Sequence, residues 1–165
     1  MKFHYAQFIL YLQNTNFKKM KKGYIAIFTA ILLLATSCKV EPEVINYGSD
    51  ACHFCKMTIV DQQHAAQYVT DKGKQFKFDA IECMLNDLEE KGSDEISIFL
   101  VSDYGTPGSM ADAQTAAYLI SQEIKSPMGA FLSAFSSEEL AKKTQQESGG
   151  ELYTWTSIKA KYDVK

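Results

Sequence analysis

The sequence predicts an α+β domain made of two similar halves, each with three strands and one helix. Three observations predict it. Short segments of alternating apolar and polar residues are followed, twice, by a segment with helical periodicity. Each helical segment ends near glycine. A further strand-like run comes after each glycine. The order β-β-α-β therefore occurs twice, which is consistent with duplication of a small ββαβ unit.

In the first half, we expect a hairpin with strands at 65–70 and 75–79, because Phe76 and Phe78 alternate and a Lys-Gly turn separates the runs. Apolar residues at 81, 84, 85 and 88 predict a helix over 80–91, with Gly92 as its stop. The β-branched run at 96–101 has the composition of a buried strand.

In the second half, the pattern partly repeats. We expect a strand at 116–121, a short loop at 126–129 and a helix at 136–147 that begins with a Ser-Ser-Glu-Glu cap. A strand at 151–155 follows two glycines, and a final short helix is expected at 156–162. The segment 131–135 precedes the helix as 78–81 precedes the first one, which supports the duplication.

Composition limits the classes of function. The 165 residues include 17 lysines, no arginine and 20 acidic residues. All acidic residues lie at Glu41 or later, so the chain without residues 1–37 carries 12 lysines and a net charge of −8. An acidic chain without guanidinium groups is poorly suited to bind phosphate backbones, and we expect no nucleic-acid partner.

The N-terminus has the order of an export signal. An apolar stretch at 23–37 follows a lysine-rich run at 18–22 and ends in small residues before Cys38. It is shorter than the run of about 20 apolar residues that spans a membrane. We therefore expect residues 1–37 to be a cleaved signal peptide, with Met20 as an alternative start.

The segment LATSC at 34–38 resembles a bacterial lipobox, which implies that Cys38 becomes the lipid-modified first residue. Acyl chains contribute about 0.8 kcal/mol per buried methylene, so two or three hold a protein on a membrane. The alternative is a secreted protein with a stray thiol. We expect a tether at 38–49, a domain at 50–165, and a lipid-anchored protein of the cell envelope facing the periplasm or extracytoplasmic space.

The motif CHFCKM at 52–57 carries the clearest chemical signal. Two cysteines separated by two residues can converge on one ion, and Met57 adds a thioether two residues later. Thiolate and thioether donors favour Cu(I), whereas zinc sites use thiolate and imidazole. The motif therefore favours copper. His53, between the cysteines, is either an additional ligand or an exposed neighbour.

Other interpretations of Cys52 and Cys55 remain open. One is a structural disulfide, although so small a ring stabilises little. Another is a thiol-disulfide oxidoreductase pair, although no βαβ pattern precedes the motif. A third is a structural zinc site with Cys83 and His53 as further ligands. Haem attachment is excluded because Lys56, not histidine, follows the second cysteine.

Met128 is a second candidate soft ligand. It lies in the sequence SPMG at 126–129, where proline and glycine constrain the loop, and its alternative role is to fill the core. Cys83 and Met84 lie on the apolar face of the first expected helix, and for both a buried core position is the default. His64 is expected at the surface.

No enzyme motif is found. The chain has no Ser/His/Asp order, no phosphate-binding glycine pattern and no His-Glu-x-x-His. Asp79 and Asp103 follow expected strands, where turn and cap roles explain them.

Taken together, the motifs resemble one family, the NosL family of copper-binding lipoproteins. The resemblance spans about residues 50–159. It rests on the ordered motifs Cys52-x-x-Cys55-x-Met57, Phe78-Asp79, Ser102-Asp103-Tyr104, Ala116-x-Tyr118, Ser126-Pro127-Met128-Gly129, Ala134-Phe135, and Gly149-Gly150 near Trp155. Met110 stands where the family usually has tryptophan.

This resemblance implies two ββαβ units with a topology similar to the organomercurial lyase core. It also implies a Cu(I)-binding carrier, not an enzyme, that delivers copper outside the cytoplasm to apo nitrous-oxide reductase or to another copper enzyme. The implied metal ligands are Cys52, Cys55, Met57 and Met128.

Overall fold

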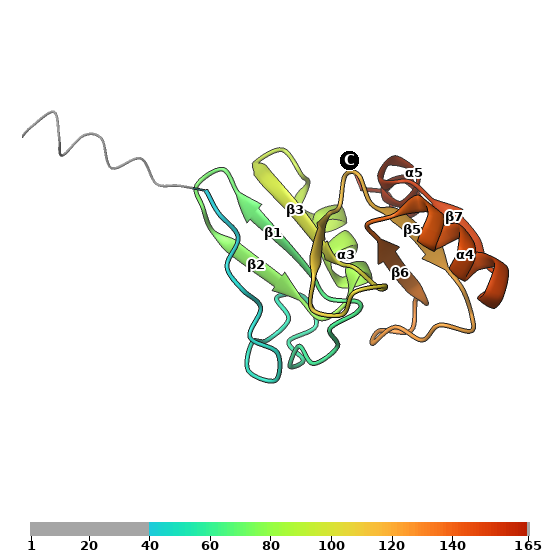
Figure 1. Ribbon diagram of the computed structural model, residues 1–165. Coiled ribbons are helices and arrows are strands. Elements are labelled where there is room, and N and C mark those ends of the chain that lie inside the picture. Colours follow the sequence, from blue (N-terminus) through green and yellow to red (C-terminus); the bar gives the residue numbers. More distant parts are fainter. Residues whose placement is uncertain (1–39, 165) are drawn as a thin grey trace, which may run out of the picture. The chain divides into compact units, whose positions relative to one another are not determined.

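Two small antiparallel sheets, each with its own helices, form the part of the chain that a computed structural model describes, residues 40–164 (Figure 1). The expected signal peptide at 1–37 and the expected lipidation of Cys38 lie outside the described residues. Within 40–164, no helix has the length and apolar character needed to cross a membrane.

The elements follow the order expected from the sequence. In chain order they are β1 (Ala66–Thr70), β2 (Gln75–Phe78), α3 (Ile81–Lys91), β3 (Ile96–Ser102), β4 (Met110–Asp112), β5 (Ala117–Ile120), β6 (Leu132–Phe135), α4 (Glu138–Ser148), β7 (Glu151–Tyr153) and α5 (Trp155–Lys161). The α+β class and the two ββαβ units are confirmed. The short strand β4 was not predicted, and β6 was expected only as the segment 131–135 that precedes the second helix.

The two halves share one strand order. The first sheet runs β2-β1-β3-β4 and the second β6-β5-β7, so the first strand of each unit lies between the other two. All named pairs are antiparallel. The strand β4 is an addition to the first unit. The same order in both sheets supports the duplication inferred from the sequence.

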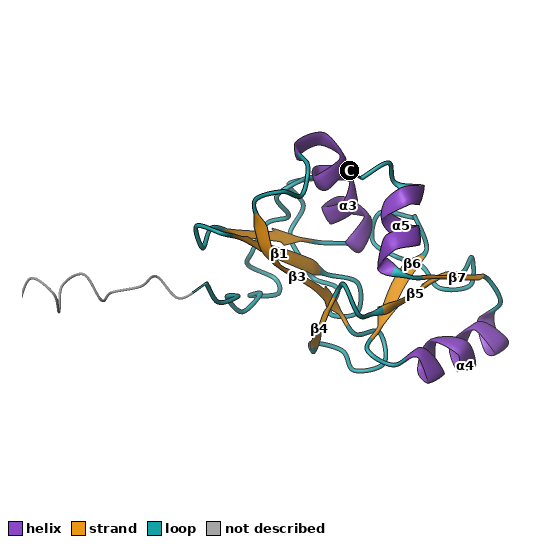
Figure 2. Ribbon diagram, turned by 90° about the horizontal axis from the view of Figure 1, so that it is seen from above, coloured by secondary structure: helices purple, strands orange, loops and turns teal. Residues whose placement is uncertain are grey.

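In the first half, α3 covers one face of the sheet with its apolar side (Figure 2). Its buried residues include Ile81, Met84, Leu85 and Leu88, as the helical periodicity predicts. The helix ends at Gly92, whose φ of 80° lets its N–H return to the Leu88 carbonyl.

The aromatic side chains of this sheet pack directly under α3. Tyr68 on β1 contacts Phe76, Phe78 and Phe99 with ring centroids 4.8–6.4 Å apart. Its hydroxyl donates to Asp87 of α3 at 2.6 Å. The alternating residues of the strands therefore fix the position of the helix that carries Cys83.

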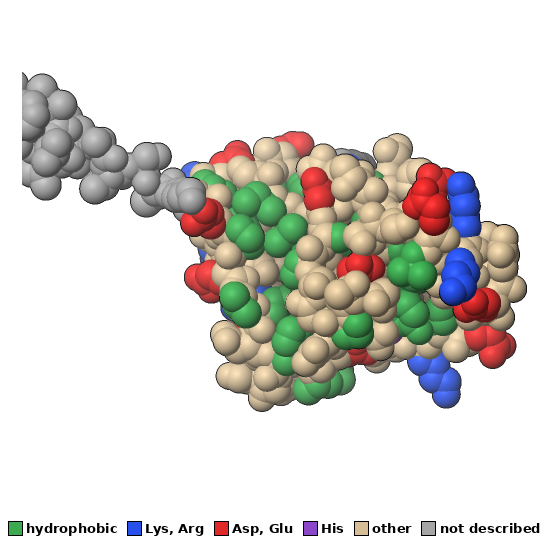
Figure 3. Space-filling model, viewed as in Figure 1, with side chains coloured by type: hydrophobic (Ala, Val, Ile, Leu, Met, Phe, Trp, Pro, Cys, Tyr) green, Lys and Arg blue, Asp and Glu red, His purple; other side chains and the backbone are tan. Residues whose placement is uncertain are grey.

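In the second half, alternation of side chains divides the core between two helices. Tyr118, Leu132 and Ala134 belong to the main core together with α5, whereas Leu119 and Phe135 pack with Ala141 of α4. Figure 2 accordingly shows α4 and α5 on opposite sides of this sheet. Charged side chains gather at the α4 end of the face drawn in Figure 3.

The capping residues expected for these helices are in place. Ser137 is the N-cap of α4 and accepts a hydrogen bond from the Leu140 N–H, as the Ser-Ser-Glu-Glu pattern predicts. Thr154 and Ser157 form a reciprocal capping box at the start of α5.

The two halves are joined through the segment after β3. Asp103 forms a parallel bridge with Ala134, and its carboxylate accepts hydrogen bonds from the Ser136 hydroxyl at 2.6 Å and the Gly105 N–H at 3.1 Å. The expected turn role of Asp103 is confirmed, and the same side chain also links the halves. A single hydrophobic cluster includes residues of both sheets.

The packed domain takes in part of the expected tether. Ile45 is buried in the core, and Lys77 donates to the Val44 carbonyl at 2.8 Å. Asn46 and Asp50 form a turn through the Asp50 carboxylate, which accepts the Asn46 N–H at 2.8 Å. These contacts hold the segment that leads into Cys52.

Candidate metal centre

The segment 52–57 forms a closed turn beside the first sheet. The N–H of Cys52 donates to the Met57 carbonyl at 2.7 Å, and the N–H of Lys56 donates to the Cys52 carbonyl at 3.0 Å. Lys56 has a φ of 65°, so the chain reverses sharply after Cys55. This tight turn brings the two cysteines of the motif to the same side, as the two-residue spacing predicts.

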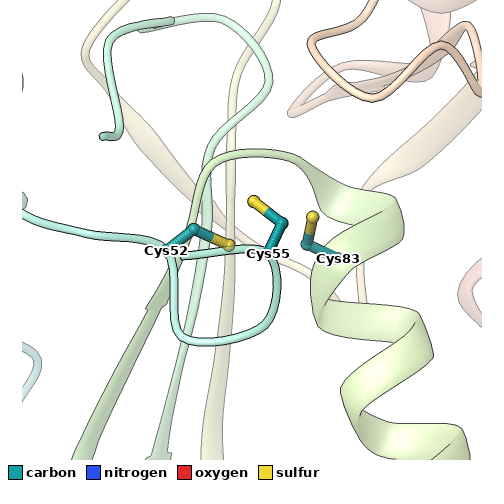
Figure 4. Close-up of side chains that lie close together, drawn as sticks. All are labelled: Cys52, Cys55 and Cys83. Carbon is teal, nitrogen blue, oxygen red and sulfur yellow. The ribbon is translucent and has the colours of Figure 1, made fainter. Parts of the chain in front are cut away.

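A third thiol faces this turn from α3. Cys83, in the first turn of the helix, points toward Cys52 and Cys55 (Figure 4). The three sulfur atoms lie within 4.8 Å of one another. Two sulfurs that bind one ion at about 2.3 Å lie at most about 4.6 Å apart. The three thiols are therefore already near the spacing that a shared ion requires.

Hydrogen bonds around Cys52 favour its thiolate. The Cys83 thiol donates to the Cys52 sulfur, and the backbone N–H groups of Asp79 and Cys55 donate as well. These bonds outweigh the effect of burial and lower the pKa of Cys52 to about 5. The lowered pKa favours the thiolate of Cys52, whose side chain is as deeply buried as that of Cys83.

The other two thiols keep their protons. Burial raises the pKa of Cys55, although the Met57 N–H donates to its sulfur. The pKa of Cys83 is raised because its proton is held in the hydrogen bond to Cys52. None of the three cysteines forms a disulfide bond. A metal ion that binds all three sulfurs would displace the remaining protons.

Met57 lies at the edge of the thiol cluster. It follows Cys55 by two residues, and its backbone bonds to both cysteines of the motif. Its side chain is 53% exposed. The thioether is therefore free to reorient without disturbing the core.

The loop that carries Met128 is fixed to the start of α3. Glu82, the residue before Cys83, accepts hydrogen bonds from the Ser126 hydroxyl at 2.6 Å and the Ala130 N–H at 3.3 Å. Gly129 has a φ of 79°, which confirms the curvature predicted for this loop. Met128 itself is 43% exposed, so it does not fill the core.

The His53 ring contacts side chains other than the cysteines. Its ring packs edge-on against Phe76 at 4.6 Å, and its Nε2 lies 2.9 Å from Lys91 Nζ and 3.8 Å from Asp87. Among residues 40–164, the close group of potential metal ligands contains only the three cysteines. The four-ligand set of Cys52, Cys55, Cys83 and His53 is not assembled.

Comparison with known families identifies the family of the chain. The NosL family model matches residues 45–162. The chain belongs to the NosL family. The match covers both ββαβ units and therefore all the cysteines of the cluster and both exposed methionines. No curated protein matches the chain significantly.

A solved structure of the NosL family has the same fold. The copper chaperone NosL from Shewanella denitrificans is 19% identical, and the alignment covers 73% of this chain and 97% of that protein, with a TM-score of 0.65. The fold of two ββαβ units expected from the family resemblance is thus confirmed.

Two features of this NosL-family domain were missed from the sequence. Cys83 was expected to be a core residue, or a zinc ligand only with His53; the structure shows it buried and within the thiol cluster. The signal was present, since Cys83 is the one other cysteine after residue 38. A buried helical cysteine, however, has the same sequence pattern whether or not it faces other thiols.

The second feature is His64, which was expected at the surface. It is 2% exposed, and its ring nitrogens lie 2.9 Å from Asp61 Oδ2 and 3.2 Å from Ser133 Oγ. This is a Ser-His-Asp arrangement that no sequence order revealed. Ser133 is fully buried in β6, so its hydroxyl cannot meet a substrate in this structure, and the three residues instead link the halves.

The chemistry of the thiol cluster favours a soft, low-coordinate ion. Structural zinc sites are almost always four-coordinate and tetrahedral, with nitrogen and sulfur ligands. Among the described residues, the close group of donor atoms consists of three sulfurs and includes no imidazole or carboxylate, and Met57 follows Cys55 by two residues. Such a donor set suits Cu(I) better than zinc.

Proposed function

We propose that this NosL-family protein is a Cu(I) carrier that holds one ion on Cys52, Cys55 and Cys83, with the thioethers of Met57 and Met128 as further donors. It binds and delivers copper and does not catalyse a reaction. The observation that carries the proposal is the convergence of three thiols from two distant segments within 4.8 Å. The copper-chaperone description of the structural neighbour supports it.

The exposure of the two methionines suits transfer. The thiols are buried or half-buried, whereas Met57 and Met128 are 53% and 43% exposed. A recipient can therefore meet the thioether side of the site first and displace these neutral donors before the thiolates. A thioether also has no proton to lose, and it cannot form a disulfide in an oxidising compartment.

The recipient in this proposal is an apo copper enzyme outside the cytoplasm, with nitrous-oxide reductase as the first candidate from the family resemblance. Anchoring at Cys38 by lipid chains would hold the carrier at the membrane surface on the periplasmic or extracytoplasmic side. The chain without residues 1–37 carries a net charge of −8, which opposes binding to nucleic acid and to anionic lipid, and in this proposal its route to the membrane is the anchor.

Titration of the reduced, purified protein with Cu(I) and with zinc tests the binding proposal. We expect one Cu(I) bound more tightly than zinc, with protons released because two of the three thiols are protonated beforehand. A Cys52→Ser variant should lose most of the affinity. A preference for zinc, or unchanged Cu(I) binding in this variant, would refute the proposal.

Transfer is tested by mixing the loaded protein with apo nitrous-oxide reductase and following copper in each protein after separation. A reductase that gains copper faster from the carrier than from a small-molecule Cu(I) complex supports delivery. The rival function, a thiol-disulfide oxidoreductase, predicts instead reversible reduction of a disulfide substrate that persists in a Met57→Leu variant.

A further inference from the structure

Glu82 connects the two halves of the domain at the metal centre. It is the second residue of α3, directly before Cys83, and its side chain is 3% exposed. Its hydrogen-bond partners belong to the other half, in the loop before β6. The residue therefore lies between the thiol cluster and the segment that carries Met128.

The contacts of Glu82 bracket Met128. One oxygen, Oε1, accepts from the Ser126 hydroxyl at 2.6 Å and from the Ala130 N–H at 3.3 Å. The Ser126 oxygen in turn accepts the Phe131 N–H at 3.0 Å. Met128 lies midway between the two residues that bond to Oε1, so a single carboxylate oxygen fixes both ends of its short loop.

The loop is shaped locally but placed by Glu82. Its own curvature comes from Pro127, from the positive φ of Gly129 and from a bond between the Gly129 N–H and the Ser126 carbonyl at 3.1 Å. None of these contacts involves the first half of the domain. The described hydrogen bonds between this loop and α3 all pass through the Glu82 carboxylate.

The Glu82 carboxylate is buried and only partly hydrogen-bonded. Its second oxygen, Oε2, is buried and has no hydrogen-bond partner among the described residues. Burying a carboxylate that is only half satisfied opposes folding, because the lost hydration is not fully replaced. The one oxygen that is satisfied, Oε1, is the oxygen that holds the Met128 loop.

We propose that Glu82 is a positioning residue that holds Met128 at the thiol cluster, so that the thioether from the second half reaches an ion bound to the first. This inference rests on the proposed function. It makes the relative position of the two halves part of the metal site, since α3 presents both Cys83 and the anchor of the Met128 loop.

A double-mutant cycle in Cu(I) affinity tests the proposal. Glu82→Ala and Met128→Leu should each weaken Cu(I) binding about ten- to a hundred-fold, the range for residues that orient metal ligands. Both changes remove the same interaction. The double variant should therefore bind Cu(I) about as tightly as whichever single variant has the lower affinity. Affinity is measured by competition with a chromophoric Cu(I) chelator.

Three further variants separate positioning from general structure. Glu82→Gln keeps the acceptor oxygen and should restore most of the affinity, and Ser126→Ala should reproduce part of the loss even if Glu82→Ala folds poorly. Glu90→Ala removes an exposed carboxylate from the same helix and should have no effect. X-ray absorption of the copper-loaded protein should count one sulfur fewer in Glu82→Ala than in Glu82→Gln.

The outcomes distinguish this inference from the proposed function. If the wild-type protein does not bind Cu(I), or if cysteine variants bind it unchanged, the proposed function fails. If cysteine variants lose affinity but Glu82→Ala does not, only the role of Glu82 is overturned. If Met128→Leu has no effect, the role of Glu82 is overturned and Met128 is removed from the proposed donors, while the thiol carrier stands. Losses that multiply in the double variant would likewise overturn it.

Discussion

The sulfur of Cys83 lies within 4.8 Å of the sulfur of Cys52, although a complete β-hairpin separates the two residues in the chain. Hydrogen bonding from Cys83 is the largest of the effects that lower the pKa of the Cys52 thiol and so favour its thiolate. The candidate metal centre is therefore assembled from two parts of the chain, the turn at 52–57 and α3.

Replacement of Cys83 by serine should weaken Cu(I) binding by at least about 100-fold. Loss of a residue that only orients a ligand costs up to about 100-fold in metal affinity, and loss of the ligand itself should cost no less. The matched control is Met84→Leu, the next residue on α3, which is fully buried and changes little in volume. Competition titrations with a Cu(I) chelator measure both. Equal affinities in the two variants would remove Cys83 from the site.

Replacement of Met128 by leucine should lower Cu(I) affinity about ten- to a hundred-fold and leave zinc affinity unchanged, because zinc sites seldom use thioethers. Met110→Leu is the control, since the Met110 sulfur accepts a hydrogen bond from Ser102 inside the first sheet. Both metals are titrated into both variants. A parallel loss of zinc binding would indicate a general structural effect instead.

Replacement of His53 by alanine should leave Cu(I) affinity unchanged, because the ring faces Phe76 and Lys91. The expected cost is about 1 kcal/mol of folding free energy from the lost edge-on ring contact. Chemical unfolding and Cu(I) titration measure the two effects separately. If instead the variant lost its metal and unfolded with chelator, the structural zinc site would be the better description.

Acid should loosen the junction of the halves through Asp103. Burial opposes ionisation of this carboxyl, but hydrogen bonds from Ser136 and Gly105 outweigh it and lower its pKa below 3.8. The associated stabilisation is therefore present above pH 3.8, the ordinary value, and is lost as pH falls through the lower pKa of the folded state.

Asp103→Asn should reduce the free energy of unfolding by about 1–3 kcal/mol at neutral pH and flatten its decline in acid. Asp94→Asn, at an exposed position, serves as the control. Urea unfolding at a series of acidic pH values gives both curves. A variant whose curve runs parallel to that of the wild type would show that Asp103 does not carry this dependence.

Most of the fold could be predicted because its elements have local causes. Alternation in β1 and β2, helical periodicity in α3 and the Ser137 cap of α4 are properties of neighbouring residues. The strand β4 has only three residues, and β6 carries a fully buried serine, so neither shows a clear alternating pattern. Their pairing depends on partners elsewhere in the chain.

The sequence by itself determined two repeated β-β-α-β units and the turn that brings Cys52 and Cys55 to one side. Spacing and backbone conformation within a few residues are sufficient for both. Only the tertiary structure decided that Cys83 joins them, that His64 is buried and that Glu82 anchors the Met128 loop. These relations depend on how α3 packs between distant segments, and an apolar helical face looks the same in sequence whether it meets a core or a metal site.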